Sequence, residues 1–270
     1  MLRSMYSAIS GLKNFQTKLD VVGNNIANVS TTGFKKGRVT FQDLMSQQVT
    51  GASSPTANRG GVNPSQVGLG AKIGTIDTIT EQGNMQNTGR PLDLAISGDG
   101  YFIVNNGNSS FYTRAGNFYL DDAGNLVNSD GYYVQAYSGT DTTGTPGKIA
   151  IDKDKYSSFS IGPTGEITGV NSDNQVETIG TIALAQFNNP DGLTKAGNNL
   201  FTPSGNSGPA EVGTADSAGS SIQSSTLEMS NVDLSEEFTS MIEAQRGFQA
   251  NARVITTSDQ ILQELVDLKR

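Results

Sequence analysis

The last stretch of the chain, residues 233–270, most constrains what this protein can fold into. Two sets of its residues recur at a seven-residue spacing: Met241, Phe248, Ile255 and Leu262, and, four positions later in each repeat, Gln245, Ala252, Asp259 and Val266. This repeat is typical of a helix that packs lengthwise against other helices. Because Gln245 and Asp259 are poor core residues, we expect a helix that is weakly stable alone and needs partners.

The first segment of the chain mirrors the last. Its apolar residues Met5, Ile9 and Leu12 are spaced by four and three residues, and Met5, Leu12, Leu19 and Ile26 lie seven residues apart. Residues 1–40 contain six basic residues and one acidic residue, whereas residues 233–270 contain seven acidic and four basic ones. We therefore expect residues 1–32 and 233–270 to pair as a coiled-coil-like helical domain that also packs against copies in other subunits.

The rest of the chain has a different composition. Residues 33–89 and 223–232 are rich in Gly, Ser, Thr, Asn and Gln, and we expect them to form a connector in which residues 50–70 are an extended or loosely structured linker. Within it, Val39–Met45 is an apolar patch expected to form a turn or a strand, and Lys72–Ile79 has the pattern of a strand.

Residues 90–222 have the pattern of short strands separated by Asp-Gly and Asn-Gly turns, which indicates one antiparallel all-β domain. Within it, residues 200–220 are rich in Gly, Ser and Ala and are expected to be a long loop. The sequence therefore predicts an α+β protein that is mainly β, with terminal helices, a Gly/Asn-rich connector and one β domain.

Composition excludes several classes of function. The formal net charge of -8 argues against nucleic acid or an anionic membrane surface as the main partner. The absence of His and Cys removes the commonest general base, the thiolate nucleophile and the usual zinc ligands. No apolar run approaches the roughly 18 residues that a membrane span needs, and the N-terminus lacks a cleavable signal pattern. We expect no membrane insertion, and either a cytoplasmic protein or export without a cleaved signal.

The carboxylates form no convincing acid–base pair. Most lie in or beside turns, where Asp is favoured because it bonds to nearby backbone N–H groups: Asp93, Asp99, Asp121, Asp122 and Asp130. Asp152 and Asp154 have the spacing of a calcium loop, but the Gly and the closing Glu of that loop are missing. Neither Gly68–Gly70 nor Gly98–Gly100 has the spacing of a phosphate loop. The sequence therefore predicts no catalytic, cofactor or metal site and no enzyme.

The basic residues of the chain are expected to have structural roles. Lys35, Lys36 and Arg38 are predicted to form a solvated surface or a subunit contact. Arg114 lies among apolar strand residues, and we expect it to pair with a carboxylate across a β edge rather than to act in catalysis.

Several long segments resemble one known family, the rod and hook proteins of the bacterial flagellum. The segments are Leu19–Asn28 with Thr32–Lys35, Leu92–Phe102, Tyr112–Phe118, Glu228–Leu234 and Met241–Asn251. They occur in the family's order and cover nearly the whole chain, with only about 138–225 weakly matched.

The resemblance implies a structural subunit that polymerises with itself into a helical tube. The terminal helices would form the inner wall around an export channel. The implied partners are other copies of the chain, the distal rod, hook cap and hook–filament junction proteins, and the flagellar type III export apparatus. The implied location is the flagellar hook or basal body, outside the cell membrane. The predicted assembly interface comprises Met5, Ile9, Leu12, Leu19, Ile26, Met241, Phe248, Ile255, Leu262 and Val266.

Within this family the sequence favours the hook, a flexible coupling that transmits torque. Residues 22–28 and 245–252 look more like the hook version, whereas the short length is that of distal rod proteins, which form a rigid drive shaft. An ordered connector would favour the rod, since bending needs a soft one. A secreted β-rich carbohydrate-binding module or hydrolase is a remote third alternative, which would not explain seven-residue repeats at both ends.

Overall fold

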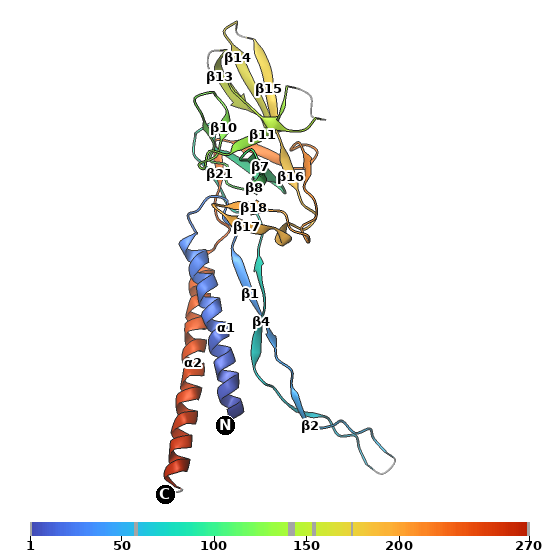
Figure 1. The fold of residues 1–270 in the computed structure, drawn as a ribbon, viewed down its shortest axis with the longest axis vertical. Helices are drawn as coiled ribbons and strands as arrows, with labels where there is room; N and C mark the ends of the chain where they lie inside the picture. The colour runs from blue at the N-terminus through green and yellow to red at the C-terminus, as the bar shows by residue number, and fades with distance from the viewer. Residues whose placement is uncertain (1, 57–58, 140–143, 153–154, 174, 269–270) are drawn as a thin grey trace. The chain divides into compact units, whose positions relative to one another are not determined.

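The computed structural model describes residues 2–56, 59–139, 144–152, 155–173 and 175–268, in two compact units (Figure 1). Met1–Ala27, Gly37–Thr78 and Asp233–Arg270 form the first, here called the helical unit. Asn28–Lys36 and Ile79–Val232 form the second, here called the β unit. Two long helices and many short antiparallel strands place the chain in the α+β class, mainly β.

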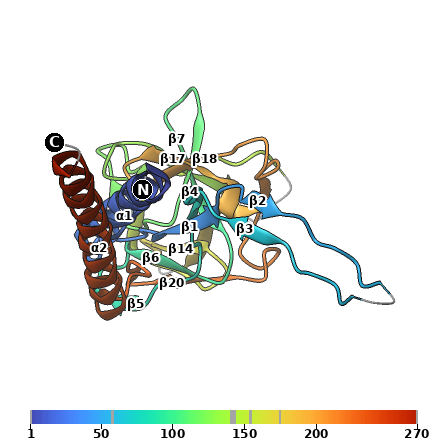
Figure 2. The ribbon, with the colours of Figure 1, turned by 90° about the horizontal axis from the view of Figure 1, so that it is seen from below.

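Two helices dominate the helical unit: α1 (Leu2–Ala27) and α2 (Leu234–Asp267). They lie side by side and run in opposite directions, as Figures 1 and 2 show. α2 begins as the sequence predicts, because the Asp233 side chain accepts hydrogen bonds from the backbone N–H groups of Ser235 and Glu236. No helix in the described residues is long and apolar enough to cross a membrane.

An antiparallel ribbon completes the helical unit. β1 (Gly37–Asp43) pairs with β4 (Ala71–Thr78), and β2 (Gln47–Thr50) pairs with β3 (Ser65–Val67). Beyond them, single bridges join Ser53 to Val62 and Thr56 to Arg59.

Residues 50–70 were expected to be an extended or loosely structured linker, and the structure shows extended, paired backbone at Thr50, Ser53, Thr56, Arg59, Val62 and Ser65–Val67. β2 and β3 are exposed along their whole length, so they have no buried face and show no alternation of apolar and polar residues. Backbone pairing, which composition does not reveal, holds this part of the ribbon.

The β unit contains all the remaining strands. They are β5 (Met85–Asn87), β6 (Leu94–Ser97), β7 (Tyr101–Asn105), β8 (Ser110–Thr113), β9 (Tyr119–Leu120), β10 (Leu126–Val127), β11 (Tyr133–Ser138), β12 (Gly147–Lys148), β13 (Tyr156–Ile161), β14 (Glu166–Asn171), β15 (Val176–Ile182), β16 (Leu184–Gln186), β17 (Thr194–Gly197), β18 (Leu200–Thr202), β19 (Glu211–Gly213), β20 (Ser221–Ser224) and β21 (Thr226–Glu228), with a 3-10 helix, η1 (Pro190–Gly192). Most belong to one 13-stranded sheet whose main path is β13-β14-β15-β11-β7-β8-β18-β17, while β20 pairs with β6 and β21 with β5.

Two elements of this unit fall in the predicted loop 200–220. Leu200 and Phe201 of β18 are buried, and β19 pairs with β16. The loop prediction is wrong at these two places, because each strand is only three residues long and too short to show a periodic pattern.

β7 lies at the centre of the core and is buried on both faces. Phe102 and Val104 pack into one apolar cluster, and Tyr101 and Ile103 pack into another on the opposite face. This explains why β7 reads as a continuous apolar run instead of an alternating one. Phe118 meets Phe102 edge-on in the first cluster, with ring centroids 5.1 Å apart.

A close backbone approach near this core gives a first prediction. A Cβ atom at Gly116 would lie 1.7 Å from the backbone oxygen of Leu94, a rigid neighbour. We expect Gly116→Ala to lower the free energy of unfolding by about 2 kcal/mol or more, as overpacking does in cores. Urea unfolding of the unpolymerised subunit measures this. Gly147→Ala is the control, because a Cβ there meets nothing within 4 Å; equal losses for both variants would contradict the packing argument.

Candidate assembly surface and buried ion cluster

The contact between α1 and α2 is built from small and polar side chains. On α2 the buried residues are Glu237, Ala244 and Ser258. With half-buried Asn251, they form a line of residues seven positions apart. On α1 the buried side chains are Ala8, Asn14, Val22 and Asn25.

This buried line differs from the predicted one. It lies three positions after Met241, Phe248 and Ile255, whereas the sequence pattern predicted the residues four positions after them. Gln245 and Asp259 are exposed, so they are not flaws in the contact. Hydrophobicity could not reveal the true line, because its members are Glu, Ala, Asn and Ser.

Asn25 is the polar centre of the helical unit. It is only 2% exposed, and its Nδ2 donates to Glu237 Oε1 of α2 at 3.2 Å and to the carbonyl of Gly37 at 2.9 Å. Its Oδ1 accepts from the Gly37 N–H at 2.9 Å. One side chain therefore joins α1 to α2 and to the first residue of the ribbon.

Two glycines let the helices approach closely. A Cβ at Gly247 would lie 2.5 Å from the ring of Phe15, and a Cβ at Gly11 would lie 2.8 Å from Asn251 Nδ2. By contrast, the ion pair between Lys18 and Glu243 is 3.7 Å long and largely exposed, so it adds little to the stability of the pair.

The ten predicted interface residues lie beside this contact and none is fully buried. Met5, Leu12, Leu19, Ile26, Met241, Ile255 and Leu262 are half-buried, while Ile9, Phe248 and Val266 are exposed. The structure thus leaves apolar surface on both helices outside their mutual contact.

α2 carries further exposed apolar residues that the sequence analysis did not select. They are Leu234, Phe238, Ile242, Val254, Ile261, Leu265 and Leu268, here called the outer apolar set. At about 100° per residue, the first three lie to one side of the buried line, and Val254, Ile261 and Leu268 lie to the other side. Leu265 continues the line itself, seven positions after Ser258. The two halves of α2 therefore present apolar surface in different directions.

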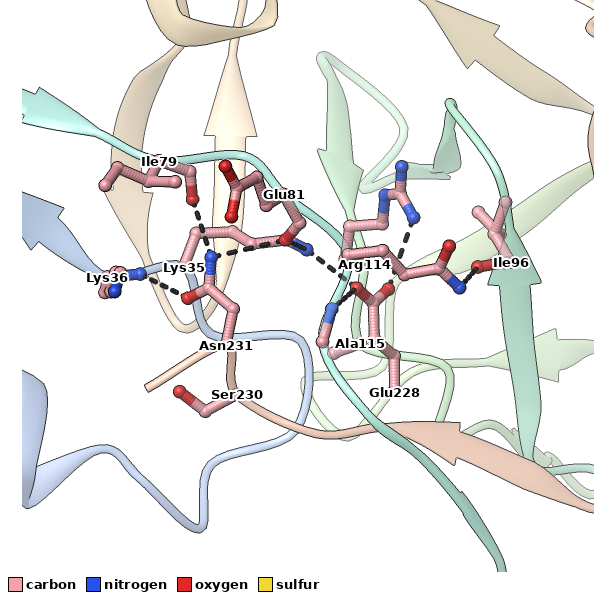
Figure 3. Close-up of polar contacts among 12 residues, drawn as sticks. Lys35, Lys36, Ile79, Glu81, Ile96, Arg114, Ala115, Glu228, Ser230 and Asn231 are labelled. Carbon is pink, nitrogen blue, oxygen red and sulfur yellow. Dashed lines mark hydrogen bonds and ion pairs between the residues drawn. The ribbon is translucent and has the colours of Figure 1, made fainter. Parts of the chain in front are cut away.

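The β unit contains a buried ion cluster (Figure 3). Lys35 Nζ lies 2.7 Å from Glu228 Oε1, and Arg114 Nη1 lies 3.3 Å from Glu228 Oε2. The side chains of Lys35 and Glu228 are 0% exposed and that of Arg114 is 4% exposed. The prediction that Arg114 pairs with a carboxylate is confirmed.

Backbone groups form further hydrogen bonds with the three charged side chains of the cluster. The Gly83 N–H donates to Glu228 Oε1 at 3.0 Å, Lys35 Nζ donates to the Glu81 carbonyl at 2.7 Å, and Arg114 Nη2 donates to the Gly98 carbonyl at 2.9 Å. Burial lowers the pKa of Lys35 below its usual value, and the Glu228 carboxylate partly offsets this effect. Two cations share one carboxylate, so the cluster depends on Glu228.

The prediction that Lys35, Lys36 and Arg38 form a solvated surface is wrong for Lys35, which is 1% exposed. A turn made by Gly33, at φ 68°, lets the chain pass so close to Ala115 that a Cβ at Gly33 would lie 2.5 Å from its backbone nitrogen. This packing carries Lys35 into the interior. Arg38 is exposed, 3.6 Å from Asp77.

Beside the cluster, Asn231 forms hydrogen bonds to two neighbouring segments of the chain (Figure 3). Its Oδ1 accepts from the Lys36 N–H at 2.8 Å, and its Nδ2 donates to the carbonyls of Ile79 at 2.9 Å and Glu81 at 3.2 Å. The Gly33 N–H also donates to the Glu228 carbonyl at 2.8 Å. Three of the segments quoted for the family resemblance, Thr32–Lys35, Tyr112–Phe118 and Glu228–Leu234, thus meet here.

Comparison with known proteins assigns the family. Three family models match: flagella basal body rod protein over residues 5–35, the flagellar hook protein FlgE/F/G D1 domain over 95–169, and the flagellar basal body rod FlgEFG protein C-terminal region over 223–268. The chain is 55% identical to the flagellar basal-body rod protein FlgG of Bacillus subtilis, with both chains fully covered. The chain belongs to the flagellar rod and hook protein family.

Both rod proteins and hook proteins are similar to this chain over their full length. The flagellar basal-body rod protein FlgG of Caulobacter vibrioides is 38% identical, with 99% of this chain and all of that protein covered. The flagellar hook protein FlgE of Borreliella burgdorferi is 33% identical, with both chains fully covered. The family is a structural one of the flagellar basal body and hook, so the motility function expected from the motifs is confirmed at this level.

The ion cluster gives a second prediction. Glu228→Gln removes the one carboxylate shared by two buried cations, and breaking a buried pair in this way costs about 3–5 kcal/mol. We expect that loss in the free energy of unfolding, measured by urea denaturation. The matched control is Glu177→Gln, which breaks the exposed ion pair with Lys155 and should have a far smaller effect. Similar losses in both variants would show that Glu228 is not special.

Tyr101 gives a third prediction, on pH. Arg114 lies over its ring at 5.3 Å, and burial raises its pKa to about 12 from 10.0. Between these values the folded state binds more protons than the unfolded state, so stability falls as the pH rises from 10 to 12. The Tyr101→Phe variant has no hydroxyl to titrate. Its free energy of unfolding should therefore fall by roughly 2 kcal/mol less than that of the wild type between pH 10 and pH 12. Parallel unfolding curves across this pH range test it, with exposed Tyr119→Phe expected to follow the wild type.

Proposed function

We propose that this protein is a subunit of the distal flagellar rod and polymerises with itself into a stiff helical tube. The observation that carries the proposal is the 55% identity to a basal-body rod protein over the whole of both chains. The similarity to a hook protein is weaker, at 33%, and its alignment extends over 441 positions because that chain carries long insertions.

This proposal replaces the hook as the preferred function. Residues 22–28 and 245–252 favoured the hook in the sequence, but they occur in a chain that is 55% identical to a rod protein. We therefore give these two short segments less weight than the identity over the whole chain, and the length also favours the rod.

The ribbon supports the rod as well. A bendable coupling needs a soft connector. Here the ribbon is paired at its base, where Gly37 lies opposite Thr78, and again near its far end, at the bridge between Thr56 and Arg59. Paired strands resist the changes in backbone dihedral angles that bending requires. In the same proposal, other rod subunits, the hook and the flagellar export apparatus are the partners, and the chain acts outside the cell membrane.

Imaging of polymers assembled from the purified chain tests rod against hook. We expect straight, rigid tubes, and curved or supercoiled tubes would favour the hook. A protein that stays monomeric under all assembly conditions would contradict both.

The proposed subunit contacts lie on the helices. The ten residues predicted from the sequence and the outer apolar set together leave apolar surface that the pairing of α1 with α2 does not cover. Covering such side chains in copies of the chain would contribute about 1.5–3 kcal/mol for each one fully buried. In this proposal α2 contacts different neighbours with its first and second halves.

A fourth prediction tests these contacts. Phe248 and Ile242 are 38% and 52% exposed in the subunit, so Asp at either position should leave it folded. We expect Phe248→Asp or Ile242→Asp to raise the concentration needed for polymerisation at least about tenfold, because a contact worth 1.4 kcal/mol or more is lost. Sedimentation measures this, and circular dichroism checks folding. Gln249→Asp, at an exposed polar position of the same helix, is the control; tubes that form normally from Phe248→Asp and Ile242→Asp would remove these contacts from the proposal.

A further inference from the structure

A cavity of about 330 Å³ lies in the β unit, beside the apolar cluster that contains Tyr101. Its walls combine two aromatic residues, Tyr101 and Phe187, with polar side chains from five separate segments: Thr80, Asp99, Arg114, Gln186, Asn188 and Glu211. A concave site with a few polar groups placed around aromatic surface is what small polar ligands need.

The cavity is rigid. The Phe187 ring meets Tyr101 and Tyr112 edge-on, with centroids 5.8 and 4.9 Å apart. Gln186 donates its amide to the Ala218 carbonyl at 2.7 Å, which fixes the orientation of the side chain. Asp99 lies between Gly98 and Gly100, whose φ angles of 105° and 134° favour glycine and hold a tight turn there.

The charges in its wall have opposite signs at different depths. Arg114 is buried, and its Nε is a buried side-chain nitrogen without a hydrogen-bond partner among the described residues. Because Glu228 is shared between Arg114 and Lys35, the inner wall keeps an excess positive charge. Asp99 and Glu211 are exposed, so the mouth is negative.

This arrangement disfavours a ligand whose charges are all of one sign. An anion meets the two carboxylates at the mouth, and a cation meets the uncompensated charge around Arg114. A neutral molecule with several hydroxyl groups suits both the negative mouth and the positive inner wall. Each hydroxyl can donate to a carboxylate and accept from a cationic or amide N–H group. The apolar face of a sugar ring also matches the aromatic surface of Phe187.

We propose that this cavity binds one residue of a neutral saccharide. The carboxylates of Asp99 and Glu211 accept hydrogen bonds from the sugar hydroxyls, Gln186 and Asn188 hydrogen-bond at its sides, and Phe187 packs against the ring. The activity is binding only, in addition to the structural role proposed above and independent of it.

Ligand-observed saturation-transfer NMR on the full-length, unpolymerised subunit tests the site. The neutral probes are cellotriose and chitotriose, and the acidic probe of the same length is trigalacturonate. We expect transfer to at least one neutral trimer, with at least fivefold weaker transfer to the acidic one. In the double variant Asp99→Asn/Glu211→Gln, transfer to the neutral trimer should fall at least tenfold. Asp173→Asn, an exposed carboxylate that does not line the cavity, should behave as the wild type.

Three results would overturn the proposal: no transfer to either neutral trimer, transfer that the double variant leaves unchanged, and equal transfer to the acidic trimer. If the sugars fail to bind and the double variant instead raises the concentration needed for polymerisation, the cavity is a contact between subunits. Because binding is measured on monomers, its failure leaves the rod proposal untouched.

Discussion

The buried carboxylate of Glu228 is the contact on which the rest of the β unit depends. Its two cationic partners, Lys35 and Arg114, lie 193 and 114 residues away in the sequence. Burying these charges is not stabilising in itself, since apolar side chains of the same volume often do as well. The cluster instead favours one fold over others, because any arrangement that leaves out one of the three segments leaves a buried charge unpaired. The cluster therefore couples residues 28–36, the β7–β8 region and residues 228–232 into one cooperative structure.

That coupling has a consequence for the ends of the chain. The two segments held at Glu228 and Asn231 are the ones that continue in sequence into α1 and α2. In an unfolded, extended chain Lys35, Arg114 and Glu228 are all solvated. The cluster can form only after both segments and the strands between them are present. Closure of the β unit therefore holds together, within that unit, the segment that follows α1 and the segment that precedes α2.

The sequence could predict the elements whose pattern repeats and could not predict contacts that depend on single polar residues. The seven-residue repeats showed both helices, and Asp-Gly and Asn-Gly turns showed the antiparallel β domain. The burial of Lys35 was not visible, because a basic residue beside Lys36 and Arg38 looks solvated until the turn at Gly33 is known. The pairing of residues 47–67 was also hidden, because an exposed two-stranded ribbon needs no apolar face.

The helix contact shows most clearly why pattern alone is insufficient. The apolar repeat at Met241, Phe248 and Ile255 was taken as one seam of the pair, yet the fully buried positions are Glu237, Ala244 and Ser258. The fully buried positions of α2 are therefore small or polar, and most of the apolar repeat is only half-buried in the single chain. Phe248 and Val266 are exposed, so part of the apolar surface is left for other molecules to cover. We infer that each helix pair becomes fully stable only when neighbouring copies arrive, so that ordering of the helices and growth of the polymer are one step.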